Sequence, residues 1–148
     1  SNFQPNQFID LASNIEVIPA VNQIETHVFY QQDKAKKYMD EFGICMMSWG
    51  PLAEGRNGLF SNRILEEIGN VHGKSIAQIA LRYLLQRGVI IIPKSTHKER
   101  MEENFNLFDF ELTDEEIEKI KGLDLGKSAF FDHLDPETVK MFMGWRNL

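Results

Sequence analysis

The chain has 148 residues, of which 43% are hydrophobic and 26% charged, and its formal net charge is −6. This is enough for one globular domain, and the negative charge argues against nucleic acid or an anionic membrane as the main partner. Cys45 is the single cysteine, so an internal disulfide is excluded and a cytoplasmic location is expected. We expect neither a membrane span nor a signal peptide. Because the chain starts with Ser-Asn-Phe rather than Met, we expect it to be part of a longer protein.

Short apolar runs alternate with amphipathic segments along the chain, which predicts alternating strands and helices. The first half is expected to form a strand over 18–24, a helix over 28–42 that ends at Gly43, a strand over 44–49, a glycine-containing loop over 51–62 and a short helix over 63–69.

Capping boxes predict the later helix starts, because each pairs a Ser or Thr with a Glu or Gln three residues on. The pairs are Ser75 with Gln78, Thr96 with Glu99 and Thr113 with Glu116. The first of these helices is expected to stop at Gly88, the second near Phe105 and the third near Lys121. The run 89–92 (VIII) is apolar throughout, as in a parallel strand buried on both faces, and the tail from Ser128 is expected to be irregular with a last helix after Pro136.

This alternation predicts βαβ units and a parallel α/β sheet. Functional residues of such sheets lie in the loops after the strands, both in a barrel and in an open doubly wound sheet. The residues of interest therefore lie just past Gln23, Trp49 and Pro93.

The loop after the third strand carries the strongest signal for a ligand. Lys94 and Ser95 stand between a buried strand and a helix N-terminus, where free N–H groups favour an anion. Arg100 and Asn104 are four residues apart and share one helix face. This pattern fits a pocket for a phosphate beside a heteroaromatic base. The alternative is a solvated basic helix start followed by a Glu-rich surface.

The other two loops are more ambiguous. Trp49 ends a strand and is followed by Gly-Pro, so its ring either stacks on a planar ligand or belongs to the core. Asn22, Gln23 and Glu25 offer polar groups that either bind a ligand amide or satisfy loop backbone. Cys45 is expected to be an inert core residue, and no nucleophile elbow is present. The histidines lack metal-ligand spacing, which predicts no metal site; they are His27, His72, His97 and His133.

Five motifs in chain order resemble the aldo-keto reductase family, with features of the bacterial small-carbonyl and diketogluconate-type reductases. They are Ser1-Asn2-Phe3, 19–25 (PAVNQIE), 48–52 (SWGPL), 91–95 (IIPKS) with Glu99-Arg100 and Glu103-Asn104, and 108–113 (FDFELT). The resemblance implies that the chain is the C-terminal half, residues 1–148, of a (β/α)8 TIM barrel and contributes its strands 6 to 8 with the following helices.

The resemblance also implies NADP(H) as cofactor and a small-molecule carbonyl as substrate. Ser1, Asn2 and Gln23 would hold the nicotinamide carboxamide, and Trp49 would stack on the nicotinamide ring. Gly50, Leu52 and Glu54 would line the path of the pyrophosphate. Lys94, Ser95 and Arg100 would bind the 2′-phosphate, with Glu103 and Asn104 at the adenine.

The family's catalytic Asp, Tyr, Lys and His lie on earlier strands that this chain does not include. The three tyrosines are expected in helices and do not replace the proton donor; they are Tyr30, Tyr38 and Tyr83. The main hypothesis is therefore an NADPH-dependent carbonyl reductase whose catalytic residues lie in a missing N-terminal half, and we expect the chain alone to be inactive and prone to self-association. The alternatives are a non-catalytic nucleotide-binding or assembly fragment, and a regulatory partner module.

Overall fold

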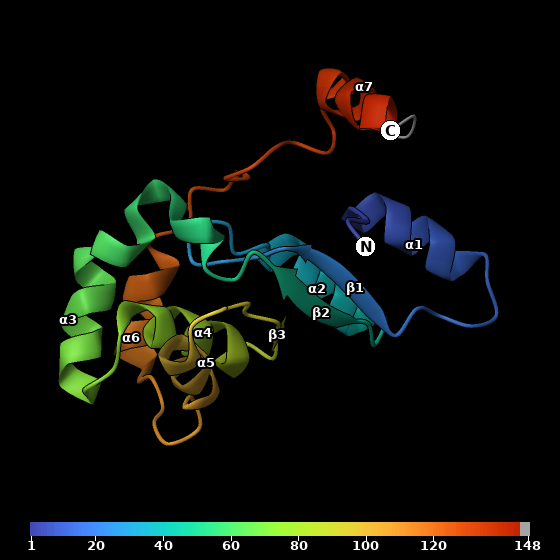
Figure 1. Cartoon of the computed structure of the whole chain (residues 1–148). Coiled ribbons are helices and arrows are strands. Elements are labelled where there is room, and N and C mark those ends of the chain that lie inside the picture. Colours follow the sequence, from blue (N-terminus) through green and yellow to red (C-terminus); the bar gives the residue numbers. More distant parts are fainter. Residues whose placement is uncertain (146–148) are drawn as a thin grey trace.

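The computed structural model describes residues 1–145 and contains three parallel strands with a layer of helices (Figure 1). The strands are β1 (Val21–Glu25), β2 (Cys45–Trp49) and β3 (Ile90–Ile91), in the order β1-β2-β3. The helices are α1 (Pro5–Ser13), α2 (Asp33–Glu41), α3 (Arg63–His72), α4 (Ile76–Gln86), α5 (Lys98–Phe105), α6 (Asp114–Lys121) and α7 (Pro136–Trp145), with a kinked 3-10 segment η1 (Ala53–Ser61). The predicted parallel α/β order is confirmed.

The two faces of the sheet differ in burial. Ile24 and Met46 are each 2% exposed and point into the helix layer. On the other face the register aligns Val21 with Cys45 and Met47 with Ile90, and Val21 and Ile90 are 40% and 38% exposed. The prediction that Cys45 is a core residue was wrong, because its position in the register puts it on this open face.

α2 and α4 cover the buried face of the sheet, and α4 lies at the centre of the core. Its Ile79, Ala80 and Leu84 are fully buried. The predicted capping box is present, since Ser75 Oγ accepts the Gln78 N–H while Gln78 Oε1 accepts the Ser75 N–H. The capping box therefore stabilises the start of α4, whose apolar side chains cover the sheet.

The buried side-chain amide of Gln31 connects α4 and α6 to the loop after β1. The Tyr83 hydroxyl donates to Gln31 Oε1 over 2.6 Å. Gln31 Nε2 in turn donates to the carbonyls of Val28 and Ile120, over 2.8 and 2.9 Å. These bonds fix α4 and α6 against the loop after β1, which stabilises the edge of the sheet where the strands end.

Several predicted boundaries were wrong. β1 starts at Val21 rather than residue 18, and β3 keeps only Ile90–Ile91. The helix expected over 28–42 starts at Asp33, because His27 and Tyr30 form a backbone bridge and Gln32 takes a left-handed conformation (φ 59°). Tyr30 is therefore a loop residue and not a helical one.

The helix prediction also failed at two other places. Thr96 does not cap α5: the N-cap is His97, without a side-chain cap, and Ser95 Oγ accepts the His97 N–H instead. α1 was not predicted at all. It packs beside α2 through an edge-to-face contact of Phe8 with Phe42, whose ring centroids are 6.4 Å apart.

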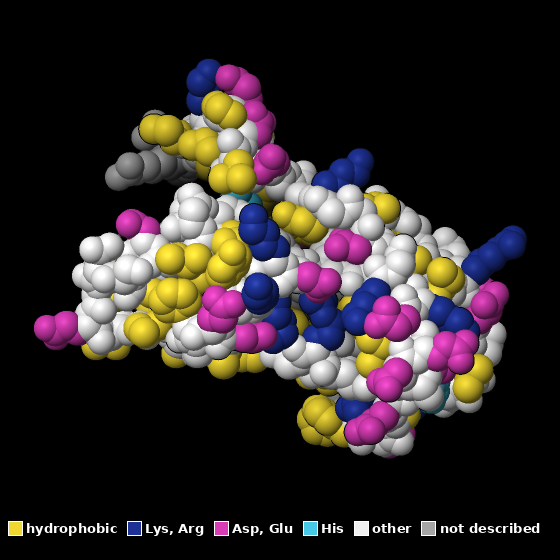
Figure 2. Space-filling view, turned by 180° about the vertical axis from the view of Figure 1, so that it is seen from behind, with side chains coloured by type: hydrophobic (Ala, Val, Ile, Leu, Met, Phe, Trp, Pro, Cys, Tyr) yellow, Lys and Arg dark blue, Asp and Glu magenta, His cyan; other side chains and the backbone are white. Residues whose placement is uncertain are grey.

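The C-terminal tail leads away from the helix layer and ends in α7, the helix predicted after Pro136 (Figure 1). Asp135 caps it by accepting the N–H groups of Glu137 and Thr138. Figure 2 shows exposed hydrophobic side chains on α7, and Met143 and Trp145 are 62% and 58% exposed. Among residues 1–145, no helix has both the length and the apolar character needed to cross a membrane.

Candidate functional site

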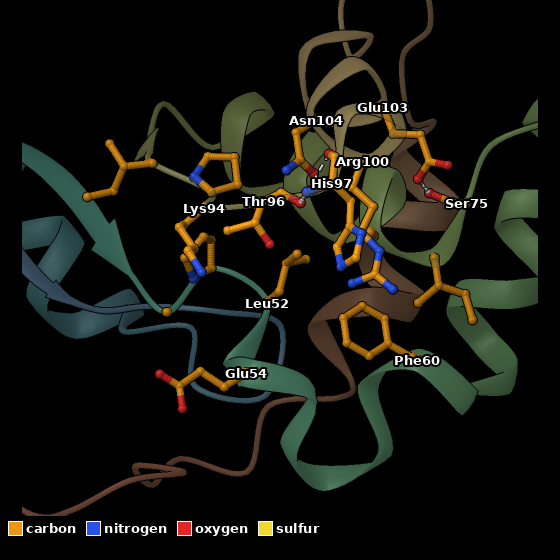
Figure 3. Close-up of a pocket in the computed structure, with 17 residues that line it drawn as sticks. Leu52, Glu54, Phe60, Ser75, Lys94, Thr96, His97, Arg100, Glu103 and Asn104 are labelled. Carbon is orange, nitrogen blue, oxygen red and sulfur yellow. Dashed lines mark hydrogen bonds between the residues drawn. The ribbon is translucent and has the colours of Figure 1, made fainter.

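The loops after β2 and β3 enclose a pocket of about 720 Å³ at the C-terminal edge of the sheet (Figure 3). η1 forms one wall, and the start of α5 forms the other. The pocket is lined by Gly50, Pro51, Leu52, Glu54, Phe60, Ser75, Ile76, Ala77, Ile92, Pro93, Lys94, Ser95, Thr96, His97, Arg100, Glu103 and Asn104. The parallel strands bring these distant segments together because their carboxyl ends share one edge.

Two cationic side chains line the pocket, Lys94 on one side and Arg100 on the other (Figure 3). Lys94 and Arg100 line it together with His97, and within residues 1–145 neither Lys94 nor Arg100 forms an ion pair. The first turn of α5 adds backbone N–H groups at the same place. Two uncompensated cations beside a helix N-terminus are suited to bind an anion.

The side chains around Arg100 show how the pocket wall is supported. In Figure 3 the Arg100 guanidinium points toward the Phe60 ring across the pocket, while Glu103 points toward Ser75. Ser75 Oγ donates to Glu103 Oε2 over 3.4 Å, and Gln78 Nε2 donates to the Glu103 carbonyl over 3.2 Å. The Glu103 carboxylate therefore helps to hold α5 against α4.

η1 bends sharply where it passes under the pocket. Ala53 and Glu54 have positive φ angles of 49° and 50°, in the left-handed region that such residues rarely adopt. Gly50, with φ of 63°, opens the loop, and a Cβ there would lie 3.4 Å from the Phe130 ring. The chain can reach this conformation because Ala53 and Leu59 are fully buried and anchor the loop.

Four predicted site residues lie outside this pocket, namely Ser1, Asn2, Gln23 and Trp49. The indole Nε1 donates to Asn2 Oδ1 over 2.7 Å, and the Asn2 N–H donates to the Gln23 carbonyl over 2.8 Å. Ser1 precedes Asn2 and is exposed. The predicted residues thus form two groups, one at Trp49 and one at Arg100, joined by the loop from Gly50 to Glu54.

Asn22 holds the N-terminal segment beside β1. Its Nδ2 donates to the Phe3 carbonyl over 2.9 Å, and its Oδ1 accepts the Phe3 N–H over 3.3 Å. Asn22 is 4% exposed and faces the helix layer, so its amide satisfies backbone as the alternative interpretation proposed. Its contribution to the site is to bring Asn2 next to Trp49.

The tail covers part of the Trp49 ring. The ring centroids of Phe131 and Trp49 are 5.8 Å apart in a stacked arrangement, and Phe130 lies 5.2 Å away at a tilt. Hydrogen bonds from Ser128 and Ala129 to Glu25 hold this segment. Burial raises the pKa of Glu25, but the hydrogen bonds from His27, Ser128 and Ala129 outweigh it, so its pKa is lowered overall.

The sequence missed the pocket residues that carry no family signature. Phe60, Ser75 and His97 all line the cavity. A signal was available for Phe60, because a large aromatic residue in a glycine-containing loop is not explained by a core strand or helix. In the structure its side chain is 57% exposed. The sequence assigns Ser75 only to a helix cap and His97 only to a loop or cap. In the part of the chain that the structure describes, no three His, Cys, Asp or Glu residues are arranged to hold a metal ion.

The fold and the site define a parallel α/β protein with a pocket at the strand ends that is lined by Lys94 and Arg100. A sequence model of the aldo/keto reductase family matches residues 1–125. The chain belongs to the aldo/keto reductase family.

Relatives and solved structures agree. The chain is 39% identical over 123 residues to aldose reductase B of Dictyostelium discoideum, covering 83% of this chain and 40% of that protein. It is 42% identical over 123 residues to the glyoxal reductase of Bacillus subtilis, covering 83% and 44%.

Two crystal structures extend the similarity to the fold. An aldo-keto reductase from a Medee basin deep-sea metagenome library superposes with a TM-score of 0.87 at 35% identity, covering 90% of this chain and 50% of that one. An aldo-keto reductase of Bombyx mori in complex with NADP gives 0.82 at 34% identity, covering 94% and 47%. The chain therefore spans half or less of the length of these relatives.

Proposed function

We propose that this chain is the C-terminal half of the barrel domain of an NADP(H)-dependent carbonyl reductase, with β1, β2 and β3 as the sixth to eighth strands of a (β/α)8 barrel. The observation that carries this proposal is the cationic pocket at the strand ends, where Lys94 and Arg100 have no carboxylate partner among residues 1–145. NADP complexes of similar structures support it.

We propose that residues of this chain hold the cofactor along its whole length. Lys94, Ser95 and Arg100 would hold the adenosine 2′-phosphate, and Glu103 and Asn104 would border the adenine. Gly50, Leu52 and Glu54 would follow the pyrophosphate. Ser1, Asn2 and Gln23 would hold the carboxamide, and Trp49 would support the nicotinamide ring. The cofactor supplies the hydride that converts an aldehyde or ketone into an alcohol; this chain binds and orients it.

Proton donation is the part of the reaction that this chain does not supply. Tyr83 is fully buried in α4, where burial raises its pKa to about 12 and its hydroxyl is used by Gln31. Tyr38 lies within α2, and Tyr30 lies beside Glu25 and Asp132 in the loop after β1. We therefore propose that the donor belongs to residues outside this chain and that the isolated chain does not reduce carbonyls.

The choice between NADPH and NADH tests the proposal at Arg100. Arg100→Ala in the complete protein should weaken NADPH binding about tenfold or more, because it removes a hydrogen bond to a charged group. NADH, which lacks the 2′-phosphate, should bind almost unchanged. Fluorescence titration with both cofactors measures this.

Lys98→Ala is the matched control, since Lys98 is on the same helix but does not line the pocket and pairs with Glu102. It should leave both affinities within twofold. Equal weakening of NADPH and NADH by Arg100→Ala, or no binding of either cofactor by the wild type, would contradict the proposal.

A further inference from the structure

Glu25 is a buried carboxylate at the end of β1 that the proposed cofactor contacts leave unused. Its side chain is 3% exposed. The Ala129 N–H donates to Oε1 over 2.8 Å, the Ser128 hydroxyl donates to Oε2, and His27 Nε2 lies 3.0 Å from Oε1. Two of these partners lie 103 and 104 positions further along the chain. A buried carboxylate needs such partners, so Glu25 and the tail depend on each other.

The tautomer of His27 follows from its second nitrogen. The Phe29 N–H donates to His27 Nδ1 over 3.2 Å, so Nδ1 is an acceptor and Nε2 carries the proton. The ring is fully buried and donates from Nε2 to Glu25. Glu25 thus accepts from three donors, which is the pattern of an ionised carboxylate.

The hydroxyl that binds Glu25 also shapes the tail segment, defined here as residues 128–131. Ser128 Oγ accepts the N–H groups of Phe130 and Phe131, over 3.0 and 2.9 Å. Arg56 closes the other side, with its guanidinium 4.5 Å from the Phe130 ring and a hydrogen bond to the Ala129 carbonyl. The two phenylalanine rings that contact Trp49 are therefore placed by a short chain of bonds that ends at Glu25.

We propose that Glu25 is a positioning residue that latches the tail segment to β1 and fixes Phe130 and Phe131 as an aromatic wall beside Trp49. The kinetic consequence rests on the proposed function, because it takes Trp49 as the support of the nicotinamide ring. A carbonyl substrate bound against the nicotinamide ring would contact Phe130 and Phe131. Planar aromatic carbonyl compounds should bind most tightly, because their rings can pack against the two phenylalanine rings. The 2′-phosphate site lies at the other end of the cofactor path and does not depend on the latch.

Glu25→Gln in the complete protein tests the latch. The amide keeps the shape of the carboxylate but loses its charge and adds a donor where a donor already points. Hydrogen exchange at the amides of Ala129, Phe130 and Phe131 should become about tenfold faster, as expected for the loss of a hydrogen bond to a charged group. The KM for a nitrobenzaldehyde should rise about tenfold, while kcat and the Kd of NADPH stay within about twofold.

Glu116→Gln is the matched control, because Glu116 also accepts from a histidine and from a backbone N–H, but these donors are His72 and Thr113 and not residues of the tail segment. It should leave the tail amides and the KM unchanged. Ser128→Ala removes the hydroxyl that donates to Glu25 and is the second test if Glu25→Gln does not fold. It should also make hydrogen exchange at the tail amides faster.

Unchanged exchange in a folded Glu25→Gln or Ser128→Ala variant would overturn the latch. An equal response in Glu116→Gln would do the same, because the effect would then be general destabilisation. Faster exchange with an unchanged KM would overturn the role in substrate binding. The exchange measurement needs no cofactor, so it is independent of the NADPH titration that tests the proposed function.

Discussion

At the scale of single residues, buried carboxylates connect the elements that hold the site. Glu116, at the start of α6, accepts from His72 Nε2 at the end of α3 and from the Thr113 N–H, over 2.9 and 2.8 Å. Burial raises its pKa, but these hydrogen bonds outweigh burial and lower it overall from the ordinary value of 4.5. A lowered pKa means that folding stabilises the ionised carboxylate relative to its protonated form.

The sign of the pH dependence follows. The stabilisation by Glu116 is fully present above the unfolded pKa of about 4.5 and is lost as the pH falls through the lower folded pKa. Glu116→Gln should reduce the free energy of unfolding at pH 7 by about 1–3 kcal/mol. The free energy of unfolding of this variant should also fall less between pH 7 and pH 4 than that of the wild type. Urea unfolding at pH 7 and at pH 4 measures both, and an unchanged acid slope would show that Glu116 is not one of the groups that titrate.

At the scale of elements, local signals worked where they were complete within a few residues. The caps at Ser75 and Thr113 and the turn at Gly88 (φ 72°) appear where the sequence predicted them. The failures came from distant partners. α2 begins late because the loop over 26–32 is organised by Gln31 and Glu25, whose partners lie in α4, α6 and the tail. No pattern within residues 28–42 contains that information.

For the candidate site as well, the sequence predicted the residues with local signals and missed those placed by distant contacts. The sequence predicted the cationic group from Lys94 and Arg100, because both lie near one helix start. It did not predict Phe60 in the pocket or Phe131 on Trp49, because these contacts join loops far apart in the chain. The strand 89–92 was expected to be buried on both faces, yet Ile90 is 38% exposed, since burial of the second face depends on what covers the sheet.

The cap of α4 gives a prediction at this scale. Ser75→Ala removes the acceptor for the Gln78 N–H and should lower the free energy of unfolding by about 1 kcal/mol, the usual cost of losing a helix N-cap. It also removes the hydrogen bond from Ser75 to Glu103 that supports α5. Thermal unfolding should show a lower midpoint for Ser75→Ala, whereas Ser61→Ala should change little, because Ser61 is exposed at the end of η1 and its hydroxyl makes a solvent-exposed hydrogen bond to the Gly58 carbonyl. Equal midpoints for the two variants would rule out the cap as a stabilising feature.

At the scale of the whole molecule, the open face of the sheet is the most informative feature. Val21, Cys45 and Ile90 are exposed there, although the strands that carry them are apolar and parallel. Parallel sheets are normally covered on both faces. α7 presents further exposed apolar side chains at the end of the tail (Figure 2). We interpret both surfaces as contacts for the N-terminal half of the proposed barrel.

This interpretation predicts how the isolated chain of 148 residues behaves. A three-stranded sheet has two edges whose unpaired backbone groups attract other strands, and an uncovered apolar face adds a hydrophobic driving force. Three strands per chain do not add up to eight in a dimer, so self-association can cover the face without completing the family barrel. We therefore expect oligomers or a loosely packed state in sedimentation and broad thermal unfolding. Adding the N-terminal half should restore a monodisperse species and a sharp transition. A compact monomer with one sharp transition and no binding of a hydrophobic dye would contradict the half-barrel proposal, because that fragment would have closed its own fold.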